Sequence, residues 1–125
     1  MAEKTQKQKT GGLGEGEAAQ YLVNKGYKII ERNHRQKWGD EIDIVAQDRE
    51  GILVFVEVKA IRKFGISELM PEDNLNFNKL RKLKRLCQFY ANSHRDLVND
   101  GGWRIDLVAV DMLKNDFTFR HYENI

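Results

Sequence analysis

Two strand-like segments carry the residues of this chain with the clearest capacity for chemistry. Asp43 lies in the alternating segment 41–47, and Glu57 and Lys59 follow it in the β-branched run 52–59. Because side chains two apart on a strand share a face, a hairpin of these segments brings Asp43, Glu57 and Lys59 to one side of a sheet. Two carboxylates suit Mg²⁺, and a lysine beside them can orient water at a phosphoryl centre. A solvated hairpin face with cross-strand ion pairs is the alternative interpretation.

A helix predicted over residues 13–25 can add a third carboxylate. Glu15 lies three, four and seven residues before Ala18, Ala19 and Leu22, which recur at helical spacing. Glu15 therefore shares their core-facing side, where a carboxylate needs a partner or a metal ion. The alternative is that Glu15 stands in the first turn, where acidic residues favour the helix dipole.

A second helix, predicted over residues 76–91, carries five basic residues in seven positions. They are Lys79, Arg81, Lys82, Lys84 and Arg85. Lys79 falls within the apolar stripe of this helix and Lys82 borders it, whereas the other three lie on the outer faces. Such a row can bind a phosphate backbone, and a solvated helix face is the other interpretation.

The strand and helix signals together predict an α/β fold. The predicted strands cover residues 27–33, 41–47, 52–59, 103–110 and 116–122. With the two helices, the order is α-β-β-β-α-β-β, which predicts a mixed central sheet flanked by helices. The β-branched run 52–59 indicates that the third strand is central.

The sequence predicts one domain with a flexible tail and one mobile loop. Residues 1–12 are rich in Lys, Gln and Thr and are predicted to form a flexible tail, and residues 13–125 a single domain. Residues 60–72 are predicted to form a mobile loop around Phe64–Gly65, and Pro71 suits the entry to the second helix.

Charge, hydropathy and cysteine content bear on the partners and the location of the protein. Of the net charge of +2, all comes from the first ten residues, so overall basicity does not predict a nucleic-acid partner. No apolar run approaches the roughly 18 residues of a membrane span, so we expect no membrane partner. The single cysteine, Cys87, rules out an internal disulfide, is predicted to be a core thiol and favours a cytoplasmic location.

Several ordered motifs resemble those of the YraN (UPF0102) family, from about Gly14 to Val110. They are Gly14-Glu15-x-x-Ala18-x-x-Tyr21-Leu22, Gly26-Tyr27, Glu31-Arg32-Asn33, Glu41-Ile42-Asp43-Ile44-Val45-Ala46, Val54-Phe55-Val56-Glu57-Val58-Lys59, the Lys79 helix and Arg104-Ile105-Asp106-Leu107-Val108. That family resembles the restriction-endonuclease-like, PD-(D/E)XK nuclease fold, a three-layer α/β arrangement. It is similar in particular to archaeal Holliday junction resolvases.

The resemblance implies a function and a set of roles. It implies a metal-dependent endonuclease acting on branched or structured DNA, in repair or recombination; the alternative is an inactive nuclease-fold module that binds DNA or a repair partner. Mg²⁺ (or Mn²⁺) would be held by Asp43, Glu57, Glu15 and the Val58 carbonyl. Lys59 would orient the attacking water. Lys79 would contact a phosphate or an acidic residue of the site.

Some positions depart from the family pattern or allow two interpretations. Asp40 stands where the family has glycine, and Arg62 stands one position later than the family arginine, which leaves it a weak phosphate contact. Trp38 is expected to fill the sheet edge rather than stack on a base, and Asp106 to pair with a basic residue rather than join the site. We expect His34, His94 and His121 to be ordinary surface or loop residues. A homodimer is expected by analogy with resolvases, with the C-terminal strand (Phe117, Phe119, Tyr122) as its surface.

Overall fold

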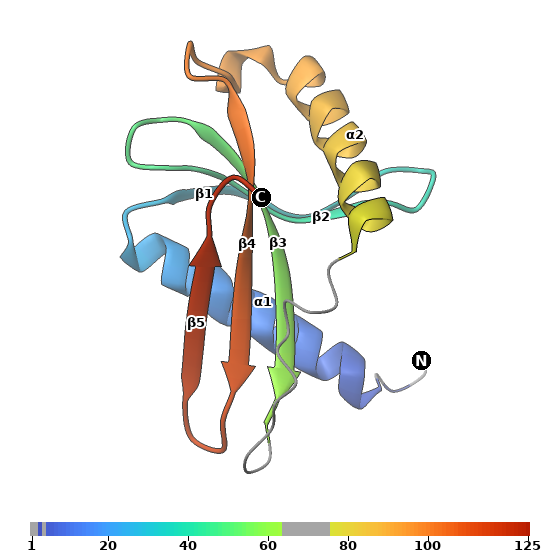
Figure 1. Cartoon of the computed structure of the whole chain (residues 1–125), viewed down its shortest axis with the longest axis vertical. Coiled ribbons are helices and arrows are strands. Elements are labelled where there is room, and N and C mark those ends of the chain that lie inside the picture. Colours follow the sequence, from blue (N-terminus) through green and yellow to red (C-terminus); the bar gives the residue numbers. More distant parts are fainter. Residues whose placement is uncertain (1–2, 4, 64–75) are drawn as a thin grey trace.

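Five strands and two α-helices make up the computed structural model of the chain, which describes residues 3, 5–63 and 76–125. The elements are α1 (Gln6–Asn24), β1 (Lys28–Arg35), β2 (Glu41–Gln47), β3 (Leu53–Arg62), α2 (Phe77–Ser93), the short 3₁₀ helix η2 (Arg95–Leu97), β4 (Trp103–Met112) and β5 (Phe117–Tyr122). The strands form one sheet in the order β1-β2-β3-β4-β5 (Figure 1). The predicted α-β-β-β-α-β-β order is confirmed.

The sheet is mixed, as predicted. β3 and β4 are parallel, and every other neighbouring pair is antiparallel. A parallel pair needs a long crossover, and α2 lies in the connection between these two strands. The predicted hairpin of β2 and β3 is closed by Asp48, whose Oδ1 accepts hydrogen bonds from the N–H groups of Glu50 and Ile52. β3 is a central strand, as its β-branched sequence indicates.

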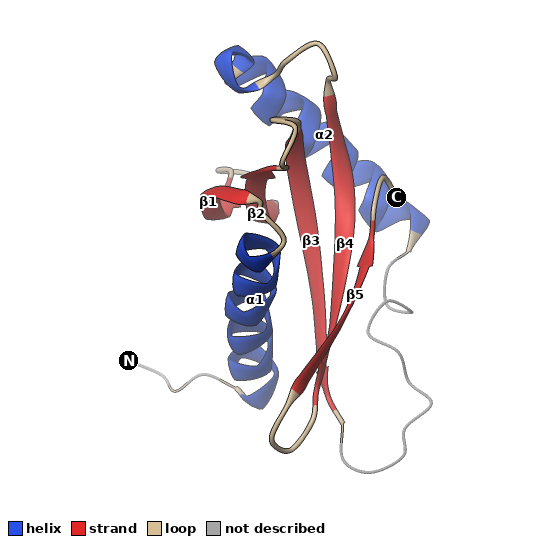
Figure 2. Ribbon diagram, turned by 90° about the vertical axis from the view of Figure 1, so that its left-hand side faces the viewer, coloured by secondary structure: helices blue, strands red, loops and turns tan. Residues whose placement is uncertain are grey.

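The two helices cover opposite faces of the sheet, which gives three layers (Figure 2). The alternation of β3 decides which side chains meet which helix. Val54 and Val56 pack in the cluster that contains Ala18 and Leu22 of α1. Phe55 packs in the other cluster, with the apolar side chains of α2, including the buried thiol of Cys87. Glu57 is two residues beyond Phe55, so the same alternation points it towards α2.

Helix α1 begins seven residues earlier than predicted. Thr5 caps it: the N–H of Gln8 donates to Thr5 Oγ1 at 3.1 Å, and the N–H of Thr5 donates to Gln8 Oε1 at 2.8 Å. Residues 6–12, predicted to lie in the tail before the helix, therefore belong to α1, and the capping box compensates for Gly11 and Gly12 inside the helix. The helix ends where predicted, before Gly26, which has the left-handed φ of +92° that favours glycine.

Strand β3 is longer than predicted. Every residue from Leu53 to Arg62 pairs with a residue of β4, so residues 60–62 continue the strand instead of opening a loop. The remainder of the predicted loop, with Phe64–Gly65 and Pro71, lies almost wholly outside the described residues. The extension matters for the site, because it fixes Glu57 and Lys59 in the middle of a long strand.

A buried ion cluster ties β4 to β5. The fully buried Asp106 accepts a hydrogen bond from Arg104 Nε at 3.0 Å, and its Oδ2 lies 2.8 Å from His121 Nε2. Although burial raises the pKa of Asp106, the bonds to His121 and Arg104 outweigh this and hold the pKa below its usual value. The expected pairing of Asp106 is confirmed. The expectation that His121 is a surface residue is wrong, because its side chain fills the space beside this carboxylate.

The aromatic residues of β5 that were expected to form a dimer surface partly pack inside the protomer. Phe119, expected to serve a dimer surface, stacks on Tyr21 of α1 with ring centroids 4.7 Å apart. Phe117 likewise packs against the α1-side core. Within the described residues, neither helix is long and apolar enough to cross a bilayer.

Candidate active site

The candidate site forms where strands β2 and β3 separate. Their ladder runs from the Gln47–Leu53 pair to the Ile44–Val56 pair and stops there, while β2 continues alongside β1 as far as Glu41. The next residue on β2 is Asp43, whose Oδ2 accepts a hydrogen bond from the N–H of Val58 at 2.8 Å. The side chain of Asp43 thus accepts the hydrogen bond that a ladder partner would otherwise accept. This bond fixes the carboxylate at the fork, the point where β2 and β3 separate.

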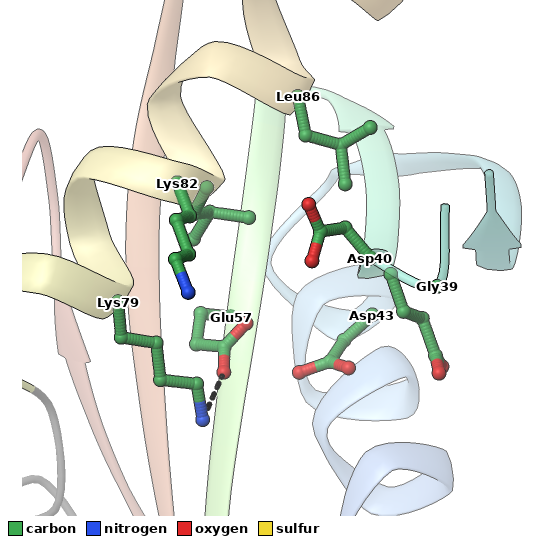
Figure 3. A pocket seen from close by; sticks show the side chains of 9 residues that line it. Gly39, Asp40, Asp43, Glu57, Lys79, Lys82 and Leu86 are labelled. Atoms are coloured by element: carbon green, nitrogen blue, oxygen red, sulfur yellow. Dashed lines mark ion pairs between the residues drawn. The ribbon is translucent and has the colours of Figure 1, made fainter. Parts of the chain in front are cut away.

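Glu57 is the first residue of β3 beyond the fork, and it is 7% exposed. Its Oε1 lies 3.3 Å from Lys59 Nζ and 3.7 Å from Lys79 Nζ, which reaches down from α2. Figure 3 shows the carboxylates of Asp43 and Glu57 facing each other, with Lys79 on the far side of Glu57. The structure therefore brings Asp43, Glu57 and Lys59 together, as the strand alternation predicts, and Lys79 contacts an acidic residue of the group, as expected.

Glu15 reaches the same place from the α1 layer. It is 8% exposed and lies in the third turn of α1, so the interpretation as a first-turn residue is wrong. A Cβ at Gly14 would overlap the Cβ of Ala60, so glycine is what lets α1 approach β3 here. Burial raises the pKa of Glu15, and Arg32, 3.4 Å away, opposes the rise only in part.

Glu41 completes an acidic group that the sequence reasoning did not identify. Carboxylate oxygens of Glu15, Glu41 and Asp43 lie within 4.8 Å of one another. Glu41 also accepts a hydrogen bond from Arg35 at 2.8 Å. The signal was present in the sequence: Glu41 and Asp43 are two apart on one strand and share a face. The geometry of this group suits a divalent cation with hard oxygen ligands.

The pKa of Asp43 is strongly raised in this acidic group. Burial raises its pKa, the charge of Glu57 raises it further, and the result is about 8 despite the opposing bond from Val58. Glu15 and Glu41 add smaller contributions in the same direction. A like-charged, half-buried group of this kind is unfavourable without protons or a cation.

The lysines next to Glu57 affect each other. Burial alone would lower the pKa of Lys59, but its contact with Lys79 and the charge of Glu57 raise it above the usual value. That contact with Lys59 is the main reason that the pKa of Lys79 is lowered, and burial lowers it further. Of the two amines, the contact therefore favours the proton on Lys59.

Asp43, Glu57 and Lys79 line a pocket of about 250 Å³ between the sheet and α2. Its lining joins three kinds of side chain: acids (Asp40, Glu41, Asp43, Glu57), amines (Lys79, Lys82) and an apolar wall (Leu83, Leu86), with Gly39 at the edge. Acidic groups on one side and amines on the other can hold a cation and a phosphate side by side. Asp40, at the position where the family pattern has glycine, adds one more acid to the pocket.

The other predicted binding residues divide between the pocket and the remaining surface. Lys82 lines the pocket, and Arg85 lines an adjoining hollow. Arg81 and Lys84 are exposed on α2 and line neither. Arg62 is not brought to the pocket lining, because its Nε donates to Thr10 Oγ1 of α1 at 2.9 Å. Trp38, expected to fill the sheet edge, is instead exposed.

Comparison with known proteins places the whole site within a recognised family. Residues 14–110 match the family model described as "Uncharacterised protein family UPF0102". The chain belongs to the UPF0102 family. Among similar UPF0102 proteins, that of Trichlorobacter lovleyi is 53% identical over 103 residues, covering 82% of this chain and 77% of its own. That of Desulforamulus reducens is 46% identical over 107 residues, covering 84% and 83%.

A third relative extends the similarity over nearly the full length. The UPF0102 protein of Alkaliphilus oremlandii is 38% identical over 116 residues, covering 93% of this chain and 96% of its own. The UPF0102 match contains Glu15 and every residue that lines the pocket. The acidic fork and the lysines of α2 therefore lie within the part of the chain that defines the family.

Proposed function

We propose that this UPF0102 protein is a divalent-cation-dependent endonuclease that hydrolyses phosphodiester bonds in branched or structured DNA, in repair or recombination. The observation that carries the proposal is the pair of facing carboxylates, Asp43 and Glu57, beside the ammonium groups of Lys59 and Lys79. Acidic oxygens that can bind a cation lie next to amines that can bind a phosphate, which is an arrangement suited to metal-dependent hydrolysis of a phosphodiester.

The chemistry of the acidic group fits Mg²⁺ or Mn²⁺. Glu15, Glu41 and Asp43 offer oxygens within 4.8 Å of one another. The pKa of Asp43 is raised first by burial and then by the charge of Glu57, and a bound cation would offset both effects. Asp43, Glu57 and Glu15 would hold the ion, with the Val58 carbonyl as a further ligand. When bound, the ion lowers the pKa of a water and stabilises negative charge at the phosphorus.

The amines of the chain have separate tasks in this proposal. Lys59, whose pKa is raised despite its burial by its contact with Lys79 and by the charge of Glu57, donates a hydrogen bond that orients the attacking water and offsets the developing charge. Lys79 and Lys82 bind non-bridging phosphate oxygens from the α2 side. The resemblance to PD-(D/E)XK nucleases implies that in-line attack of water would break the bond between phosphorus and the 3′ oxygen, which leaves a 3′-hydroxyl and a 5′-phosphate.

The test is cleavage of a panel of linear, flapped and four-way DNAs by the purified chain in Mg²⁺, Mn²⁺ or EDTA. We expect cleavage with either cation and none in EDTA. Asp43→Ala, Glu57→Ala and Lys59→Ala should each abolish cleavage while circular dichroism shows a folded protein. Asp100→Ala removes an exposed carboxylate that does not line the pocket and should cleave like the wild type.

Two outcomes would contradict the proposal. If Asp43→Ala cleaved as well as the wild type in Mg²⁺, the pocket would not be the catalytic site. If no DNA were cut under any condition, yet salt-dependent binding persisted in EDTA, the chain would be a nuclease-fold module that only binds DNA.

A further inference from the structure

A second hollow adjoins the candidate active site. It measures about 290 Å³ and is lined by Trp38, Asp40, Lys82, Arg85 and Leu86. Asp40, Lys82 and Leu86 also line the first pocket, so the two spaces share a wall. A ligand that occupies the first pocket therefore has a direct continuation into the second.

Trp38 is the most unusual residue of this hollow. It stands in the turn between β1 and β2, directly before Gly39 and Asp40, and is 57% exposed. It meets Phe89 of α2 edge to face, with ring centroids 5.4 Å apart, and Phe89 is itself 47% exposed. Two large aromatic side chains are thus held against each other at the surface without being buried, which is typical of a binding surface rather than of a core.

The charges of the hollow indicate the kind of ligand. Lys82 and Arg85 are three residues apart on α2 and share a face, so their cationic groups can lie along one phosphate backbone. Asp40 repels phosphate from the side of the turn. Phosphates are therefore favoured on the α2 side and an uncharged, planar group is favoured against Trp38.

We propose that this hollow binds an unpaired nucleotide next to the phosphate held in the active-site pocket, with its base stacked on Trp38 and its phosphate bound by Lys82 and Arg85. This inference rests on the proposed function and specifies its substrate class. A base inside a duplex already stacks on its neighbours, whereas an unpaired base has a free π face that Trp38 can cover. The preferred DNA therefore has an unpaired nucleotide beside the scissile bond.

The test measures binding in EDTA, so that no cleavage is needed. Fluorescence anisotropy would follow the binding of labelled flapped DNA and blunt duplex of equal length. Because stacking on one aromatic side chain accounts for about 1–3 kcal/mol per base, Trp38→Ala should weaken binding of the flapped DNA about 5- to 150-fold. It should leave binding of the blunt duplex unchanged, and Trp38→Tyr, which keeps an aromatic ring, should retain most of the affinity.

Two further variants test the parts of the proposal separately. Lys82→Ala and Arg85→Ala should weaken binding of both DNAs, and each should reduce the slope of log K against log salt concentration by about one. Tyr122→Ala removes an aromatic side chain of β5 that is 41% exposed, and it should bind both DNAs like the wild type. This variant controls for the loss of an exposed ring elsewhere on the sheet.

The outcomes separate this inference from the nuclease proposal. If Trp38→Ala lost the same amount of affinity for flapped and blunt DNA, or lost no affinity for either, the proposed stacking site would be overturned. A wild type that is dimeric while Trp38→Ala is monomeric would also overturn it, since the aromatic pair would then be an interface between copies. Selective flap binding through Trp38 without any cleavage in Mg²⁺ or Mn²⁺ would keep the site and refute the nuclease.

Discussion

Replacing Asp43 by Asn should stabilise the metal-free protein at pH 8 and leave its stability unchanged near pH 4. The pKa of Asp43 rises from an ordinary value of 3.8 to about 8 in the fold, because it is buried next to Glu57. An amide at this position cannot ionise. It still offers an oxygen to the N–H of Val58, which donates to the carboxylate at 2.8 Å in the wild type.

The sign and size follow from proton linkage. Between pH 4 and pH 8 the folded protein binds more protons at Asp43 than the unfolded chain does, so the free energy of unfolding falls as the pH rises. One unit of pKa corresponds to about 1.4 kcal/mol, which gives an upper limit of about 5 kcal/mol at pH 8. Water entry and relaxation reduce this, and we expect Asp43→Asn to gain about 2–5 kcal/mol at that pH.

Urea unfolding in EDTA at pH 4.5 and pH 8 measures the effect, with the exposed Asp100→Asn as the control for losing one formal charge. Adding Mg²⁺ at pH 8 should stabilise the wild type, since an ion that binds only the folded state raises its stability, and should have little effect on Asp43→Asn. A stability difference between Asp43→Asn and the wild type that is the same at both pH values would refute the electrostatic reasoning.

Three further predictions concern the scaffold. Gly14→Ala should destabilise by about 1–3 kcal/mol because its Cβ overlaps Ala60, whereas Gly11→Ala, with open space around it, should gain about 0.5–1 kcal/mol; urea unfolding compares them. Asp106→Asn should lose about 1.5–3 kcal/mol at pH 7, since it removes the charged partner of the hydrogen bonds with Arg104 and His121, while Arg104 keeps its ion pair with Asp48. Because the pKa of Asp106 is lowered in the fold, this difference should disappear as the pH falls below about 4 in urea titrations. Burial raises the pKa of Cys87, so thiol reagents should label it only when the protein unfolds.

The sheet could be predicted from the sequence because alternation in β2 and the β-branched run of β3 are both typical of strands. Val54 and Val56 face α1 and Phe55 faces α2, as the alternation requires. The start of α1 could not be predicted from the apolar spacing, because Gly11 and Gly12 interrupt it. The Thr5 and Gln8 capping box is the local signal that identifies the true start.

The site was predictable to the extent that it depends on which residues share a face. Asp43, Glu57 and Lys59 follow from strand alternation, and Glu15 from helical spacing. Glu41 was missed as a site residue although it shares the face of Asp43, two residues away on the same strand. The burial of His121 could not be predicted, since its partner Asp106 lies on the neighbouring strand and sequence spacing does not reveal that contact.

The acidic group lies at the point where regular pairing between β2 and β3 ends. If β2 and β3 paired along their full length, the backbone of Asp43 would be part of the ladder and its carboxylate would have no reason to bind the N–H of Val58. Because the ladder stops at Ile44 and Val56, the two strands open a space that α1 reaches from one layer and α2 from the other. The same separation of the strands buries Asp43 next to other carboxylates, which is unfavourable. The two apolar clusters, one on each face of the sheet, stabilise the fold enough to tolerate this cost.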